Sequence, residues 1–293
     1  MRTSAFKQVD VFTSEPMRGN ALAVVLDADG LGDADMQRVA AWTNLSETTF
    51  VLAPSQPGAS YRLRIFTPRN ELPFAGHPSV GSGHALLEAG MIKPGTPIVQ
   101  ECAAGLLPVR VVGEGAARRV FVTAPPIRRL PNAAAAGTDA AVALGAKALA
   151  DAPQFIDSGP HWLLCDLGDE RSVRELKPDL AAIAALAHRI AGIGIAVFGR
   201  APGSEYALAV RAFCPGAGIA EDPVTGSVAA ALGFVLAQSG ELKSIGSSFA
   251  ISQGREIGRD GRIEVNVDTA SGRVEIGGQS VTCVDGTLVL PGD

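Results

Sequence analysis

Hydrophobic and polar residues along the chain form many short runs typical of strands and fewer segments with helical spacing. The strand-like runs are rich in β-branched and aromatic residues and are bounded by glycine or proline. Two helical segments, 78–87 and 227–238, are apolar on nearly every side, a pattern typical of buried helices. The pattern predicts strands at 21–26, 61–66, 108–112, 120–122, 206–213 and 262–267, and helices at 33–42, 78–87, 179–191 and 227–238.

The same order of elements occurs twice along the chain. The strand-like segment 61–68 resembles 206–215, since both run into an aromatic residue, a small residue and proline. Further on, 77–82 (HPSVGS) resembles 222–227 (DPVTGS), and each is followed by an apolar helix and then a β-rich stretch. A repeat of this long period predicts two duplicated half-domains.

We therefore expect an α+β fold of two similar half-domains, each a curved, mainly antiparallel sheet rolled around one central apolar helix. The half-domains are expected at 1–123 and 124–293, with a proline-rich linker at about 124–135 and a small helix after it.

The starts of the two central helices are candidates for anion binding. They are expected at Gly81/Ser82 and Gly226/Ser227. If the halves face each other, both helix N-termini point into one cleft, where free N–H groups and the helix dipoles would bind a carboxylate. Ordinary N-capping by the two serines is the alternative.

Composition narrows the class of protein. The chain of 293 residues has a net charge of −5 at pH 7 and no run of Lys and Arg, which disfavours nucleic-acid and anionic-membrane partners. Its first residues lack a signal-peptide layout, and its longest apolar run is far shorter than the ~20 residues of a membrane span. The four cysteines and four histidines show no metal-binding spacing. We expect a cytoplasmic protein without a metal site.

Three titratable side chains are candidates for acid–base chemistry. Glu47 lies among short polar residues between a helix and a strand, and a carboxyl in a low-dielectric cleft suits proton transfer near neutral pH. His77 and Asp222 occupy matching places in the repeat as aligned above, each directly before a proline. An exposed loop acid, a core histidine and an N-cap aspartate are the alternatives. Opposed titratable groups in an anion-binding cleft favour acid–base chemistry.

The chain resembles the PhzF-like phenazine-biosynthesis isomerases, which share the fold of diaminopimelate epimerase. The matching segments run in the family's order over nearly the whole chain, and the combination of NLSETTF, ELPFAGHP and EDPVTGS is highly specific. The segments are 9–13 (VDVFT), 19–25 (GNALAVV), 44–50 (NLSETTF), 66–68 (FTP), 71–78 (ELPFAGHP), 221–227 (EDPVTGS) and 253–254 (QG).

The resemblance implies an isomerase that needs no cofactor and acts on a small cyclic carboxylate. The prototype substrate is trans-2,3-dihydro-3-hydroxyanthranilate, in which a hydrogen moves from C3 to C1, and family members are typically homodimers. Glu47 matches the acid–base glutamate, other polar residues match the groups that orient the substrate, and backbone amides at two glycines match the sites for its anionic groups. The expected site comprises Glu47, His77, Asp222 and Ser227 as catalytic residues, and Asn20, Ser46, Gly76, Gly81, Ser82 and Gly226 as substrate-binding residues.

Some positions depart from the family's commonest pattern and leave the exact substrate open. Ala21 stands where proline usually follows Gly-Asn, and 258–261 reads GRDG where many members have G-R-P-S. The related epimerases carry two cysteines at their helix starts, whereas this chain has Gly-His at 76–77 and Glu-Asp at 221–222. A proton shift by one base therefore fits better than two-base racemisation.

Two other functions stay open at this point. One is an epimerase or racemase of a small amino acid that would use Glu47 and Asp222 from two faces. The other is a non-catalytic protein that binds small carboxylates.

Overall fold

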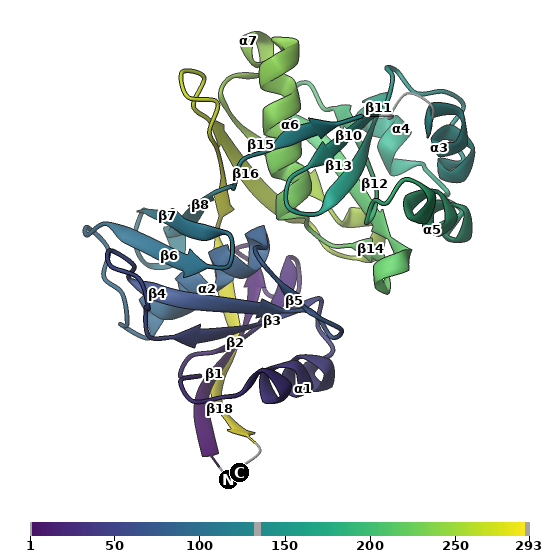
Figure 1. Cartoon of the computed structure of the whole chain (residues 1–293). Coiled ribbons are helices and arrows are strands. Elements are labelled where there is room, and N and C mark those ends of the chain that lie inside the picture. The colour runs from purple at the N-terminus through teal and green to yellow at the C-terminus, as the bar shows by residue number, and fades with distance from the viewer. Residues whose placement is uncertain (1, 132–135, 291–293) are drawn as a thin grey trace. The chain divides into compact units, whose positions relative to one another are not determined.

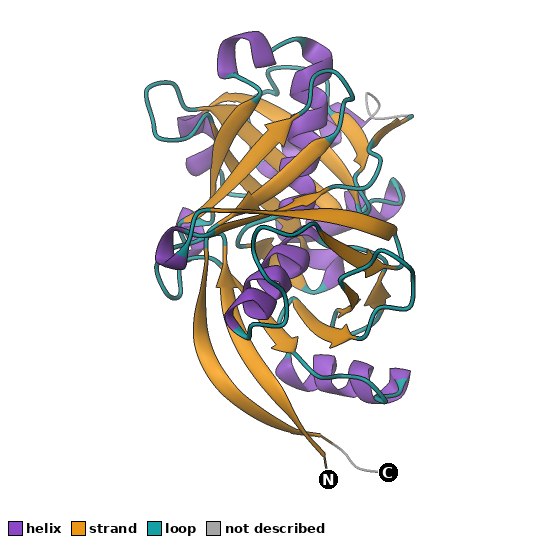
Figure 2. Ribbon diagram, turned by 90° about the vertical axis from the view of Figure 1, so that its left-hand side faces the viewer, coloured by secondary structure: helices purple, strands orange, loops and turns teal. Residues whose placement is uncertain are grey.

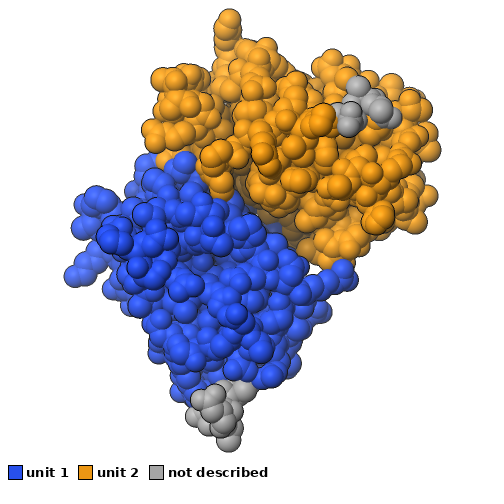
Figure 3. All heavy atoms as spheres, viewed as in Figure 1, with its two compact units in different colours: residues 1–123, 277–293 blue, residues 124–276 orange. Residues whose placement is uncertain are grey.

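The chain divides into two compact units (Figure 3). The computed structural model describes residues 2–131 and 136–290. Unit 1 comprises 1–123 together with 277–293, and unit 2 comprises 124–276. The expected boundary after 123 coincides with this division, but the expected C-terminal half-domain of 124–293 is too long. Its last strand, β18 (Ser280–Leu290), pairs along its length with β1 (Arg2–Val11) and so belongs to unit 1.

Unit 1 is a mixed sheet curved around one helix, α2 (Gly76–Glu88) (Figures 1 and 2). The helix contacts β1, β2, β3, β8 and β18, and all its residues up to Leu87 are buried. The strand order is β18-β1-β2-β3-β4-β6-β7-β8, with β5 beside β4, and only β2–β3 and β4–β6 are parallel. The other elements are β2 (Asn20–Val25), α1 (Asp33–Thr43), β3 (Glu47–Leu52), β4 (Tyr61–Phe66), β5 (Glu71–Leu72), β6 (Ile98–Cys102), β7 (Gly105–Val112), the 3-10 helix Gly115–Ala117 and β8 (Arg119–Thr123).

Unit 2 has the corresponding arrangement around α6 (Gly226–Ser239), as Figure 1 shows. Its strand order is β9-β10-β11-β12-β13-β15-β16, with β14 beside β13, and only β11–β12 and β13–β15 are parallel. The other elements are β9 (Arg128–Leu130), α3 (Gly137–Leu144), β10 (Gln154–Asp157), β11 (His161–Asp169), α4 (Glu170–Arg174), α5 (Leu180–Arg189), β12 (Gly194–Arg200), β13 (Leu208–Cys214), the 3-10 helix Pro215–Ala217, β14 (Ile219–Asp222), α7 (Leu242–Ile245), β15 (Ser248–Gln253), the 3-10 helix Arg255–Ile257 and β16 (Gly261–Val267). The strand β17 (Val274–Gly278) begins in unit 2 and ends in unit 1.

The two units repeat one topology, which confirms the expected duplication. In each, an antiparallel pair is followed by a helical connection to a parallel neighbour, through α1 in unit 1 and through α4 and α5 in unit 2. In each, the central helix follows a short strand, β5 or β14. After the helix comes β6 or β15, which pairs in parallel with β4 or β13. The strands and helices expected from the hydrophobic pattern all form, with small shifts at their ends.

The central helices begin at equivalent residues, but only one start is where the sequence indicated. Helix α6 begins at Gly226 as expected. Helix α2 begins at Gly76, two residues before the segment 78–87 that the hydrophobic pattern predicts and five before the start expected at Gly81. Gly81 and Ser82 therefore lie inside the helix. A Cβ atom at Gly81 would lie 2.6 Å from the side chain of Val11, so this glycine lets a strand pack closely against the helix.

The helix starts shift the register of the repeat by five residues. The segment 71–77 (ELPFAGH) is equivalent to 221–227 (EDPVTGS), and the two share the pattern Glu-x-Pro-x-x-Gly. The expected register aligned 77–82 with 222–227 because both contain a proline followed three residues later by Gly-Ser. This similarity is a coincidence and does not mark equivalent positions. Asp222 is consequently equivalent to Leu72 and not to His77.

Two ion pairs support the corrected register. Arg64 of β4 donates two hydrogen bonds to Glu71, at 2.7 and 2.6 Å. Arg211 of β13 donates two to Glu221, at 2.9 and 2.8 Å. Each guanidinium also lies over the ring of the Phe two residues later, at 5.1 and 5.0 Å.

The expected linker contains a strand. Within 124–135, β9 pairs with β10 in unit 2, and 132–135 lie outside the described residues. The small helix expected after the linker is α3. Within the described ranges, no helix is both long and apolar enough to cross a membrane.

Candidate active site

Glu47 and His77 lie next to each other in unit 1. Glu47 is the first residue of β3, and His77 is the second residue of α2. The Oε2 atom of Glu47 lies 3.6 Å from the Nε2 atom of His77, and their side chains are 15% and 6% exposed. The parallel pairing of β2 with β3, which sets Leu22 opposite Glu47, brings the start of β3 beside the central helix.

His77 is an uncharged neighbour for the carboxyl. Burial lowers the pKa of His77 to about 3, against a backbone hydrogen bond with Ala21 that acts to raise it. The imidazole is therefore neutral near pH 7. A neutral imidazole places no positive charge beside Glu47, so the two side chains do not form an ion pair with each other.

Short hydroxyl and amide side chains surround the start of β3. Ser46 donates a hydrogen bond from Oγ to Oδ1 of Asn20, at 3.4 Å, and Asn20 is buried at the start of β2. Thr49 and Ser82 hydrogen-bond through their hydroxyls at 2.9 Å. Ser82 is thus fully buried and does not cap α2, and neither it nor Gly81 lies at the helix N-terminus, which removes the reason for assigning them to substrate binding.

The first turn of α2 offers backbone donors. Its N-cap residue, Ala75, makes no side-chain capping bond, and the first N–H that bonds back within the turn is that of Ser79, to Ala75. Pro78 has no N–H, so the donors of this turn are the amides of Gly76 and His77. Such a turn favours an anionic group.

Asp222 ends β14 in unit 2 and is 9% exposed. Its Oδ2 atom accepts a hydrogen bond from Oγ1 of Thr225 at 2.6 Å. Thr225, and not Asp222, is the N-cap residue of α6. The alternative that Asp222 simply caps this helix is therefore wrong.

Ser227 is the second residue of α6, in the place that His77 holds in α2. Its Oγ atom accepts a hydrogen bond from the indole Nε1 of Trp162, at 3.0 Å. Gly226 directly precedes it, and no side chain caps this turn either.

Three polar residues near these side chains were not expected from the sequence. They are Trp162, Thr225 and Gln253, and their contacts join segments far apart in the chain. The QG segment at 253–254 was the available signal for Gln253, although it carried no role.

Other reactive side chains belong elsewhere. His84, one and a half turns along α2 from the first turn, lies 3.2 Å from Oε1 of Glu88 and 3.3 Å from Oγ1 of Thr282. Cys214 is buried at the end of β13. Over the part of the chain that is described, no three His, Cys, Asp or Glu side chains are grouped to hold a metal ion.

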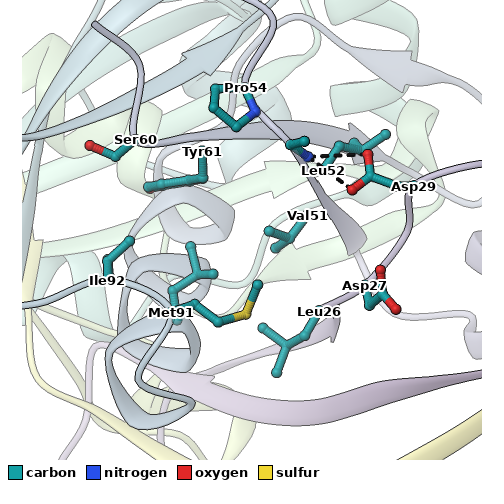
Figure 4. Close-up of a pocket in the computed structure, with 12 residues that line it drawn as sticks. Leu26, Asp27, Asp29, Val51, Leu52, Pro54, Ser60, Tyr61, Met91 and Ile92 are labelled. Atoms are coloured by element: carbon teal, nitrogen blue, oxygen red, sulfur yellow. Dashed lines mark hydrogen bonds between the residues drawn. The ribbon is translucent and has the colours of Figure 1, made fainter.

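A pocket of about 250 Å³ in unit 1 is separate from this set (Figure 4). It is mostly apolar, with Val51, Tyr61 and Met91 in its wall and Asp27 and Asp29 among its polar residues. None of the residues expected in the site lines it.

Known proteins resemble the chain over its whole length. The sequence pattern of the PhzC-PhzF family, described as "Phenazine biosynthesis-like protein", matches residues 9–286. The Schizosaccharomyces pombe protein "Antisense-enhancing sequence 1" is 38% identical over 98% of this chain and 99% of its own. A trans-2,3-dihydro-3-hydroxyanthranilate isomerase of Pseudomonas chlororaphis is 36% identical over 96% of this chain and 98% of its own. The crystal structure of a PhzF-family phenazine biosynthesis protein of Bacillus anthracis superposes with a TM-score of 0.84 at 28% identity, covering 99% of this chain and 100% of that one.

Proposed function

The chain belongs to the phenazine biosynthesis-like family and is an isomerase of that family, and we propose that it moves a proton between two carbons of a small cyclic carboxylate. The proposed substrate resembles trans-2,3-dihydro-3-hydroxyanthranilate. Relatives with that activity in their names, 33–36% identical over nearly the full chain, support this choice.

The observation that carries the proposal is the pair formed by Glu47 and His77. A carboxyl 3.6 Å from a buried imidazole whose pKa is lowered to about 3 has a neutral polar neighbour beside it. Both side chains are largely removed from water. A positioned carboxyl in such surroundings is suited to general acid–base catalysis.

We assign the proton transfer to Glu47 alone. Its carboxylate takes the proton from C3, and the electron pair of the broken C–H bond shifts into the ring. The carboxylic acid then returns the proton to C1, so that the double bond has moved and the atoms of substrate and product are the same. No step in this scheme requires a metal or cofactor.

The remaining residues are proposed to bind the substrate. Asp222 and Ser227 would hold its amino and hydroxyl groups, and the backbone amides at Gly76 and Gly226 its anionic groups. Asn20 and Ser46, which are hydrogen-bonded to each other, would bind the substrate beside Glu47.

Proton NMR in heavy water tests the proposal, with trans-2,3-dihydro-3-hydroxyanthranilate as substrate and Glu47→Gln as the variant. We expect the wild type to consume the substrate and the variant to be slower by at least ~10²-fold. Glu101→Gln is the matched control, because Glu101 is also a buried glutamate of unit 1 but accepts its hydrogen bonds from Ser55 and Gln56.

Each result has a distinct meaning. Unchanged turnover in Glu47→Gln would refute the role of Glu47. No reaction in the wild type would refute this substrate. Deuterium at an inverted α-carbon of an amino acid would indicate an epimerase instead of a double-bond shift.

A homodimer and a cytoplasmic location also belong to the proposal. The homodimer rests on family resemblance. Light scattering of the purified protein should give twice the 30.1 kDa of one chain, and a mass of 30.1 kDa would refute the dimer.

A further inference from the structure

We propose that Gln253 and Thr225 are positioning residues that fix the Asp222 carboxylate as a hydrogen-bond acceptor for an amino or hydroxyl group of the substrate. The inference rests on the proposed function, because it takes Asp222 as a substrate-binding group. It gives a role to the QG segment at 253–254, to which neither the fold nor the proton transfer assigns one.

The side-chain amide of Gln253 joins the end of β15 to the loop before α6. Its Oε1 atom accepts from the backbone N–H of Thr225 at 3.0 Å. Its Nε2 atom donates to the backbone oxygen of Asp222 at 2.9 Å and to Oγ1 of Thr225 at 2.8 Å. Gln253 is only 1% exposed, so these bonds do not compete with water.

The partners define the direction of every bond in this group. A backbone N–H can only donate and a backbone oxygen can only accept, so the Gln253 amide has one orientation. The hydroxyl of Thr225 therefore receives a hydrogen from Nε2 and donates its own to Oδ2 of Asp222, at 2.6 Å. A carboxylate held as an acceptor recognises a donor group on the substrate and repels a second carboxylate.

Two glycines allow the end of β15 and the start of β16 to pack closely against the loop before α6. A Cβ atom at Gly254, whose φ is +97°, would lie 2.6 Å from the backbone oxygen of Pro223. A Cβ atom at Gly261 would lie 2.1 Å from Cγ2 of Val224. The loop that follows Asp222 is thus packed closely against both strand ends, at Pro223 and at Val224.

Unit 1 shows that the fold does not need this arrangement. At the places of Asp222 and Thr225 it has Leu72 and Ala75, and at the end of β6, where β15 has Gln253, it has Cys102. Its loop is held differently. The N–H of Ala104 donates to the oxygen of Pro73 at 3.1 Å, and Gln100 of β6 donates to Oγ of Ser79, which donates to the oxygen of Ala75. The same topology thus forms without a carboxylate and a hydroxyl at the places of Asp222 and Thr225, which favours a functional role for this pair.

Steady-state kinetics with trans-2,3-dihydro-3-hydroxyanthranilate test the inference. Thr225→Val removes the hydroxyl at nearly constant shape, and Gln253→Glu removes the amide donors. We expect each to raise KM about 10- to 100-fold, as for the loss of a hydrogen bond to a charged group. Thr225→Ser keeps the hydroxyl and should rescue KM to near the wild-type value. Ser252→Ala is the matched control, since Ser252 is buried beside Gln253 but bonds to Arg174 and Arg262.

A double-variant comparison separates positioning from a merely structural effect. If Thr225 acts through Asp222, Thr225→Val should add little to the KM of Asp222→Asn. Additive losses, or an unchanged KM in Thr225→Val, would overturn the inference.

The inference can also be judged if the wild type does not act on this substrate, a result that would refute the proposed substrate. Crystal structures of the wild type, Thr225→Val and Ser252→Ala then decide. Displacement of the Asp222 carboxylate in Thr225→Val alone would support the inference, and an unchanged carboxylate would overturn it.

Discussion

Asn44 and Ala191 have the same left-handed backbone, with φ of 53° and 55°, where the helical connection of each unit turns into its next strand. Three residues later, unit 1 has Glu47 and unit 2 has Gly194. A Cβ atom at Gly194 would lie 2.1 Å from the backbone oxygen of Phe213, so no side chain fits there. The duplicated fold therefore holds an acidic group at this position only once.

The single acid–base group that we propose, Glu47, has a consequence for isotope labels. With deuterium at C3 of the substrate and turnover in ordinary water, we expect some product to carry deuterium at C1, because the same carboxyl removes and returns it. Mass spectrometry of the product at low conversion measures this fraction. A product whose C1 hydrogen comes entirely from solvent would argue against one sheltered base.

The buried imidazole of His77 makes stability depend on pH. Its pKa is about 3 in the folded chain and 6.5 in the unfolded chain, so the unfolded chain binds more protons below pH 6.5. The free energy of unfolding is therefore unaffected by this titration above pH 6.5. It decreases by about 1.4 kcal/mol per pH unit as the pH falls from 6.5 towards 3.

Urea unfolding at pH 7 and pH 5 should accordingly show a smaller loss of stability in His77→Gln than in the wild type. His84, whose pKa burial also lowers, is present in both proteins, so the difference isolates His77. Equal losses in the two proteins would contradict a neutral buried His77.

The two equivalent ion pairs differ in burial and should differ in energy. The side chains of Arg211 and Glu221 are 7% and 9% exposed, against 15% and 37% for Arg64 and Glu71. Arg211→Met would leave a buried carboxylate without its partner and should cost about 3–5 kcal/mol. Arg64→Met should cost about 1 kcal/mol or less. Urea denaturation measures both, and similar losses would show that burial does not set these energies.

The contact between Gly261 and Val224 should be sensitive to one methyl group. Gly261→Ala would crowd Val224 and should cost about 1–3 kcal/mol of unfolding free energy. Adding Val224→Ala should restore most of it by removing the clash. Thermal unfolding of the single and double variants checks this. Gly216→Ala is the control, since a Cβ there meets no atom within 4 Å; a full loss in the double variant would contradict the steric explanation.

Local patterns were sufficient for the elements of the fold. The apolar helices were identifiable because α2 and α6 are wrapped by strands and carry almost no polar surface. The helix starts were less well defined, since neither has a side-chain cap that would mark it in the sequence. The C-terminal residues were assigned to the wrong half-domain. Their strand β18 pairs with β1 from the opposite end of the chain, and no local sequence pattern indicates such a pairing.

The candidate site was predictable only where one segment carries the chemistry. Glu47 and His77 were each singled out as titratable residues within one short segment, and the structure brings them together. Thr225 and Gln253 did not, because their role depends on hydrogen bonds between a loop and a strand end that meet only in the folded unit. The true repeat register depends likewise on the contacts between strands β4 and β5 and between β13 and β14.

Because β18 belongs to unit 1, this unit can be completed only after the whole of unit 2 has been synthesised. All of unit 2, which ends at Ile276, is synthesised before Ser280–Leu290. The first unit to be translated is thus the last to be completed, and until then β1 has a long unpaired edge on the side that β18 will cover. The nascent chain must keep that edge from pairing with other chains while the second unit folds.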